Sequence, residues 1–95
     1  MKIYNNPKWK EDYEEDLLLL EEQIHQIILH NDEFNTFDYV IDCLMEICEH
    51  SEEQAEQCAH LVHYKGKCDV KRGTMEDLIP RHHKLLDKGL STEIV

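Results

Sequence analysis

The residues best suited to chemistry form a short polar corner, Asn31-Asp32-Glu33, followed four residues later by the aromatic ring of Phe37. Between them, Asn35 or Thr36 is placed to cap a helix by accepting hydrogen bonds from the free amides of its first turn. An amide and two carboxylates beside an aromatic ring suit a small cation that is attached to an apolar group. Taken alone, these residues are equally consistent with a solvated turn.

The charge of the chain narrows the classes of partner. The net charge is −11 over 95 residues, and residues 24–64 contain nine acidic side chains with no Lys or Arg. A stretch without a single base argues against binding to nucleic acid or to an anionic membrane surface. It favours a cationic ligand, although an acidic surface often serves solubility alone.

Four cysteines are separated by four, nine and nine residues and include no C-x-x-C pair: Cys43, Cys48, Cys58 and Cys68. A zinc site that combined them with His60, His63 or His82 would have no recognisable ligand spacing. Three of the cysteines fall at apolar positions of expected helices or strands, where Cys behaves as a small hydrophobic residue. We therefore predict core residues, with no metal and no cofactor.

The first 22 residues differ from the rest of the chain. Pro7, paired asparagines and dense acidic residues oppose a packed face, and the Leu17–Leu20 run is too short for a signal peptide or a membrane span. We predict a flexible extension over residues 1–22, a core domain over residues 23–95, and a cytoplasmic location. The alternative is that Leu17–Leu20 packs on the core.

Apolar periodicity and capping residues predict six elements in the remaining chain. Ser51-Glu52-Glu53-Gln54 has the form of a capping box, and Gly66 and Gly89 are placed to end helices. Pro80 lies inside the third helix and is expected to bend its first turns. The predicted strands are 23–29, 67–71 and 91–95, and the predicted helices are 36–49, 51–64 and 74–88.

This β-α-α-β-α-β order predicts an α+β fold, a two-layer sandwich in which three helices cover one face of a three-stranded antiparallel sheet. The polar corner lies where the first strand passes into the first helix. We expect the end of the second helix, residues 61–67, to come close to it.

With both segments in view, the sequence resembles the ClpS family, adaptors that supply N-end-rule substrates to the Clp protease. The resemblance rests on Asn31-Asp32-Glu33 before a helix and on Val62-His63-Tyr64-Lys65-Gly66-Lys67 at the end of the next one. It covers about residues 26–94. Both motifs at this separation make a specific pattern.

The resemblance implies that Asn31, Asp32 and His63 bind the free amino group of a substrate, with Glu33 on an acidic rim. A neutral histidine offers a ring nitrogen as acceptor. A third carboxylate in its place would raise the pKa of a neighbouring carboxyl group.

The resemblance also implies an apolar pocket for the first side chain of the substrate, when that residue is Leu, Phe, Tyr or Trp. The matching positions are Phe37, Ile41, Ala59, Val62 and Ile94. Phe37 and Ala59 stand where relatives often have Met, which leaves the preference order among these substrates open.

On the opposite face, the resemblance places docking for a ClpA- or ClpC-type AAA+ unfoldase at Glu76 and Arg81. It implies an adaptor with no catalytic residues. The tail matches, by position only, an extension that helps to hand over substrate.

Two other classes remain as alternatives. A ribosomal stalk C-terminal domain has a related fold, but it needs a basic helix face, and residues 24–64 have no base. An enzyme could use Asp32 and His63 as an acid–base pair, but no nucleophile has a recognisable setting.

Overall fold

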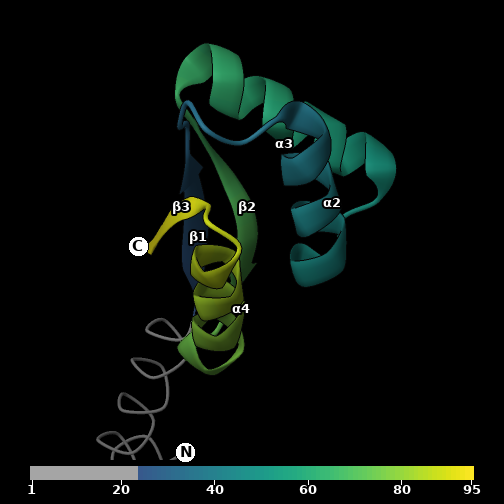
Figure 1. The fold of residues 1–95 in the computed structure, drawn as a ribbon. Coiled ribbons are helices and arrows are strands. Elements are labelled where there is room, and N and C mark those ends of the chain that lie inside the picture. Colours follow the sequence, from purple (N-terminus) through teal and green to yellow (C-terminus); the bar gives the residue numbers. More distant parts are fainter. Residues whose placement is uncertain (1–23) are drawn as a thin grey trace, which may run out of the picture.

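The computed structural model describes residues 24–95, so the expected extension over residues 1–22 lies outside the described residues. The observed order of elements is the predicted one (Figure 1). The elements are β1 (His25–His30), α2 (Phe37–Cys48), α3 (Glu52–Lys65), β2 (Lys67–Gly73), α4 (Met75–Asp87) and β3 (Ser91–Ile94).

The three strands form one antiparallel sheet with the order β2-β1-β3, so the first strand lies at its centre. Ile27 pairs with Lys71 and Ile28 pairs with Asp69, which leaves Val70 as an extra residue in β2. This β-bulge lies on an edge strand, where bulges commonly re-aim side chains. The predicted α+β fold class is confirmed.

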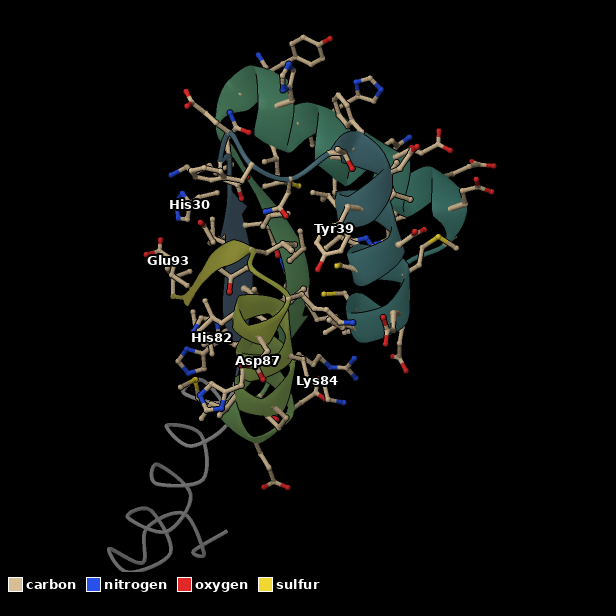
Figure 2. The ribbon with its side chains drawn as sticks, in the orientation of Figure 1. His30, Tyr39, His82, Lys84, Asp87 and Glu93 are labelled. Atoms are coloured by element: carbon tan, nitrogen blue, oxygen red, sulfur yellow. The ribbon has the colours of Figure 1, made fainter. Side chains whose placement is uncertain are left out.

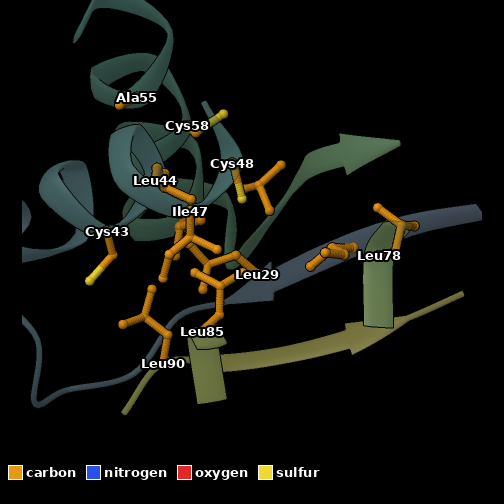
Figure 3. Close-up of a cluster of buried hydrophobic side chains, with 13 residues drawn as sticks. Leu29, Cys43, Leu44, Ile47, Cys48, Ala55, Cys58, Leu78, Leu85 and Leu90 are labelled. Atoms are coloured by element: carbon orange, nitrogen blue, oxygen red, sulfur yellow. The ribbon is translucent and has the colours of Figure 1, made fainter. Parts of the chain in front are cut away.

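The core lies between one face of the sheet and the helices (Figure 3). Ile27 and Leu29 alternate along β1 and are almost completely buried, as expected for a strand with one covered face. Cys43, Cys48 and Cys58 belong to the same cluster, so their interpretation as core residues is confirmed.

Each helix begins at the expected type of capping residue. The side chains of Thr36, Ser51 and Thr74 accept from the backbone N–H three residues later. Gly66 ends α3 with φ of 94°, a left-handed conformation that a Cβ atom disfavours. These caps fix where α2 and α3 begin and end, and therefore where the polar corner meets them.

The three helices contact the sheet to different extents. Helix α4 packs along the strands, whereas α2 and α3 pack on each other and α3 also contacts β2 (Figure 1). Pro80 lies inside α4 as the sequence indicated. None of the helices within residues 24–95 is both long enough and apolar enough to cross a bilayer.

Candidate functional site

The polar corner begins where β1 ends, and it is tied directly to α3. The backbone N–H of Asn31 donates to the carbonyl oxygen of Gly66 at 2.9 Å. This bond brings the corner beside the last turn of α3, which carries His63. The predicted proximity of the two segments is therefore confirmed.

Asp32 organises the loop between β1 and α2. Its Oδ1 accepts from the backbone N–H groups of Phe34 and Asn35, both at 2.9 Å, and its Oδ2 accepts from Asn35 Nδ2 at 2.8 Å. Burial by itself would raise the pKa of Asp32. The hydrogen bonds from Asn35 and Phe34 outweigh burial and lower the pKa below its ordinary value of 3.8. The carboxylate is therefore charged and fixed in orientation.

Two further hydrogen bonds fix the loop to the end of α4. Asn35 Nδ2 donates to the carbonyl oxygen of Gly89 at 3.0 Å. The hydroxyl of Tyr39, in the first turn of α2, donates to the carbonyl oxygen of Lys88 at 2.7 Å. Figure 2 shows Tyr39 extending from α2 toward α4. Asn35 thus has a bridging role, and Thr36 is the residue that caps α2.

A cavity of about 410 Å³ opens beside this corner. Seven of the nine residues predicted for the amine clamp, rim and pocket line it: Asn31, Asp32, Glu33, Phe37, Ala59, Val62 and His63. Asn35, Thr36 and Val40 complete the lining. One wall is therefore polar and acidic, and the other is apolar.

The other two predicted pocket residues, Ile41 and Ile94, do not line this cavity. Ile41 and Val40 both pack against the main core, and of the two only Val40, three residues after Phe37, also lines the cavity. Ile94 pairs with Ile27, which lies four residues before Asn31 and so roughly 13 Å from the corner along the strand. The role of these two residues in substrate binding therefore stays a prediction.

An aromatic group forms one rim of the cavity. The ring of Phe37 lies between the imidazoles of His60 and His63, with centroid distances of 5.1 and 5.2 Å. His60 also stacks on Tyr64 at 5.8 Å. His60 precedes His63 by three residues on α3, and this spacing could have indicated it from the sequence.

The arrangement suits one kind of ligand. Asn31 offers an amide oxygen and His63 a ring nitrogen as acceptors, and Asp32 offers a negative charge close to them. Val40, Ala59 and Val62 provide an apolar surface in the same cavity. A cationic amine carried on an apolar group would meet matching chemistry on both sides.

Comparison with known proteins identifies the family of the chain. Residues 21–93 match the family described as ATP-dependent Clp protease adaptor protein ClpS. The chain belongs to the ClpS family.

ClpS relatives cover most of the chain. The ClpS adapter protein of Thermosynechococcus vestitus is 37% identical over 68 residues, which are 70% of this chain and 72% of that protein. The ClpS adapter protein of Campylobacter jejuni strain 81-176 is 32% identical over 69 residues, covering 73% and 72% of the two chains.

A solved structure agrees in fold. It is Agrobacterium tumefaciens ClpS2 bound to L-phenylalaninamide, with a TM-score of 0.73 and 16% identity. The match covers 78% of this chain and 96% of that one. The ClpS fold is therefore present here despite low sequence identity.

The two residues predicted for unfoldase docking lie together away from the cavity. Glu76 and Arg81 line a second hollow of about 350 Å³ between α4 and the end of α2. Arg81 is committed to internal contacts: Nη1 donates to the carbonyl oxygen of Ile47 at 2.6 Å, Nε donates to Asp77 at 3.2 Å, and Nη2 lies 3.5 Å from Glu49. Its side chain is only 22% exposed. The guanidinium therefore joins α4 to the C-terminal end of α2.

Proposed function

We propose that this ClpS adaptor binds the free amino terminus of proteins that begin with Leu, Phe, Tyr or Trp, and delivers them to a Clp AAA+ unfoldase. The observation that carries the proposal is a single cavity in which Asn31, Asp32 and His63 adjoin the apolar residues Val40 and Val62. L-phenylalaninamide, bound by the Agrobacterium relative, has the same two parts, a primary amine and an aromatic side chain.

Recognition of the amine follows from the ordinary state of a chain terminus. An α-amino group has a pKa of about 7.7–8.0 and is mostly an ammonium at pH 7. It needs acceptors on several sides. Asn31 and His63 supply them, while Asp32, whose oxygens already hold the loop, contributes mainly its charge. Glu33 adds negative charge at the rim.

The apolar wall accounts for selection of the first side chain. Burying a Leu or Phe side chain contributes roughly 1.5–3 kcal/mol. A hydrogen bond to a charged group contributes about the same again. After ordering costs, two or three such terms give micromolar affinity to order of magnitude. Neither half of the cavity is sufficient alone, so both a free amine and a large side chain are required.

Delivery uses the far side of the molecule. We place docking of a ClpA- or ClpC-type unfoldase on the hollow lined by Glu76 and Arg81, with Arg81 as a positioning residue because its guanidinium is internally bonded. Lys84 lines the same hollow, extends from α4 in Figure 2, and forms no ion pair with any residue between 24 and 95. Lys84 and Glu76 are both exposed, so they present charges that a partner can reach. The adaptor acts without catalysis, in the cytoplasm.

Fluorescence anisotropy with labelled peptides that differ only at the first residue tests the clamp. Peptides with a free Leu or Phe terminus should bind, whereas their N-acetylated forms and peptides beginning with Val or Ile should bind at least tenfold more weakly. Equal affinity for free and acetylated peptides would refute the proposal. His63→Ala should weaken binding of every free peptide. His83→Ala, an exposed histidine on α4 that does not line the cavity, is the matched control.

A further inference from the structure

A third hollow, of about 310 Å³, lies at the C-terminal end of α2, between the start of α3 and the bulged edge strand β2. It is lined by His50, Asp69 and Glu49, together with Gln54, Lys71 and Arg72. Glu49 also lines the docking hollow, so the two hollows adjoin each other. Nothing in the amine clamp uses these residues.

Two buried acceptors in this hollow have no partner. His50 is 6% exposed, and its Nε2 lies 2.6 Å from the carbonyl oxygen of Val70, the extra residue of the bulge. A carbonyl oxygen only accepts, so Nε2 carries the proton and Nδ1 of the neutral ring is an acceptor. Within residues 24–95, neither His50 Nδ1 nor Asp69 Oδ1 has a hydrogen-bond partner, and both atoms are buried. Leaving such groups without donors costs free energy.

A ligand that satisfies these two atoms must therefore donate hydrogen bonds. The charged residues around the hollow bear on the charge of that ligand. The two cations of the lining already have partners: Lys71 Nζ lies 3.6 Å from Glu49, and Arg72 Nε donates to Oδ2 of Asp69 itself at 2.6 Å, which leaves Oδ1 free. Each is matched by a carboxylate. The first turn of α3 also carries Glu52 and Glu53, next in sequence to Gln54 of the lining. An anion only accepts hydrogen bonds, so it would satisfy neither His50 Nδ1 nor Asp69 Oδ1.

We propose that this hollow binds the guanidinium or ammonium group of a basic side chain, presented by the protein that docks on the adjoining hollow. The N–H groups of the cation donate to His50 Nδ1 and Asp69 Oδ1. Its positive charge shares the carboxylate of Asp69 with Arg72, whose side chain is 68% exposed to solvent. This assignment of the source rests on the proposed docking function, because Glu49 lines both hollows. The bulge at Val70 has the role of holding His50 in place.

A titration monitored by NMR tests the chemistry without any partner protein. The full-length ¹⁵N-labelled chain is titrated with Nα-acetyl-L-argininamide, which has no free amine for the clamp. Saturable shifts are expected at the amides of Gln54, Val70 and Lys71. Nα-acetyl-L-citrullinamide has a similar shape but no charge, and it should bind at least fivefold more weakly. Absence of saturable shifts at these residues, or equal binding of the two compounds, would overturn the proposal.

Matched variants separate this site from general acidity. Asp69→Asn keeps the size of the side chain and removes its charge, and it should weaken the argininamide titration at least fivefold. Asp42→Asn makes the same change at an exposed position on α2 that lines none of the three hollows, and it should leave the titration unchanged. Equal behaviour of the two variants would refute the site.

The source of the cation is tested with the unfoldase itself. Asp69→Asn should weaken unfoldase binding at least threefold while leaving the affinity for a Leu-terminated peptide unchanged. Unaltered unfoldase binding, with the argininamide titration weakened, would overturn the partner assignment. Failure of the wild-type chain to bind the peptide would instead refute the amine clamp, and the titration at His50 and Asp69 would stand independently of it.

Discussion

The clearest test of the polar corner is to remove the charge of Asp32 and keep its shape. Asp32→Asn retains an oxygen for the backbone N–H groups of Phe34 and Asn35, but the second position becomes an NH₂ group facing Asn35 Nδ2. Losing one such hydrogen bond costs about 0.5–1.5 kcal/mol. For a domain of this size each kcal/mol corresponds to a fall in melting temperature of roughly 4–8 °C.

The affinity of the same variant should fall through loss of charge. Two unit charges about 4 Å apart in a water-like environment attract by about 1 kcal/mol. The expected loss for a Leu-terminated peptide is therefore about fivefold, and it should shrink as salt is added. Anisotropy and thermal unfolding measured on the same preparations provide both numbers.

Glu33→Gln is the matched control because it removes a neighbouring charge at the same cavity. Glu33 is exposed, so the melting temperature of the Glu33→Gln variant should equal that of the wild type, and its affinity for the peptide should fall by less than twofold.

The dependence of stability on acid provides a second check. The folded-state pKa of Asp32 is lowered, so its stabilising contribution is present above its ordinary value of 3.8 and is lost as the pH falls through the lowered value. If Asp32→Asn melts, binds and responds to acid as Glu33→Gln does, Asp32 is only a rim charge.

Three other outcomes are expected. Val62→Ala should admit peptides beginning with Val or Ile, since it removes the branched carbons that meet a branched ligand, and should lower the free energy of unfolding by about 1–3 kcal/mol; rejection of those peptides by the variant would contradict this. Burial raises the pKa of Cys58 to about 12 and that of Cys48 to about 11, so neither thiol should react with iodoacetamide at pH 8 until the protein unfolds; rapid labelling of the native protein would contradict it. Deleting residues 1–22 should leave peptide affinity unchanged and impair degradation of the bound substrate by the Clp protease; normal degradation would remove the delivery role of this segment.

The sequence was sufficient where local chemistry determines structure. Thr36, Ser51 and Thr74 cap helices because a short hydroxyl side chain can accept a hydrogen bond from a free backbone N–H of the first helical turn. Asn31, Asp32 and His63 were grouped from the resemblance to the ClpS family, and all three line one cavity. The capping signals predicted the helix that follows the corner and the helix that ends beside it.

The sequence was insufficient where the answer depends on how elements meet. Ile41 and Val40 differ by one helical position, and only packing decides which of them faces the cavity. Ile94 could be placed on a strand, but its distance from the corner follows from the register with Ile27. The bulge that leaves Val70 unpaired, and with it the hollow at His50, has no pattern of side chains that would indicate it. Each of these three features depends on contacts between residues that are far apart in the sequence.

The length of α2 has a consequence for substrates. The helix begins at the cavity with Phe37 and ends next to the docking hollow, and its 12 residues span about 18 Å at 1.5 Å each. A helix of that length is rigid, so it keeps a bound amino terminus at a constant distance from the proposed docking hollow. An extended polypeptide advances about 3.3 Å per residue, so some six residues are needed to bridge the same offset. If the unfoldase docks at this hollow as proposed, a protein whose first residue lies close to its own folded domain should be delivered poorly, and an extended leader of at least that length should be needed for degradation.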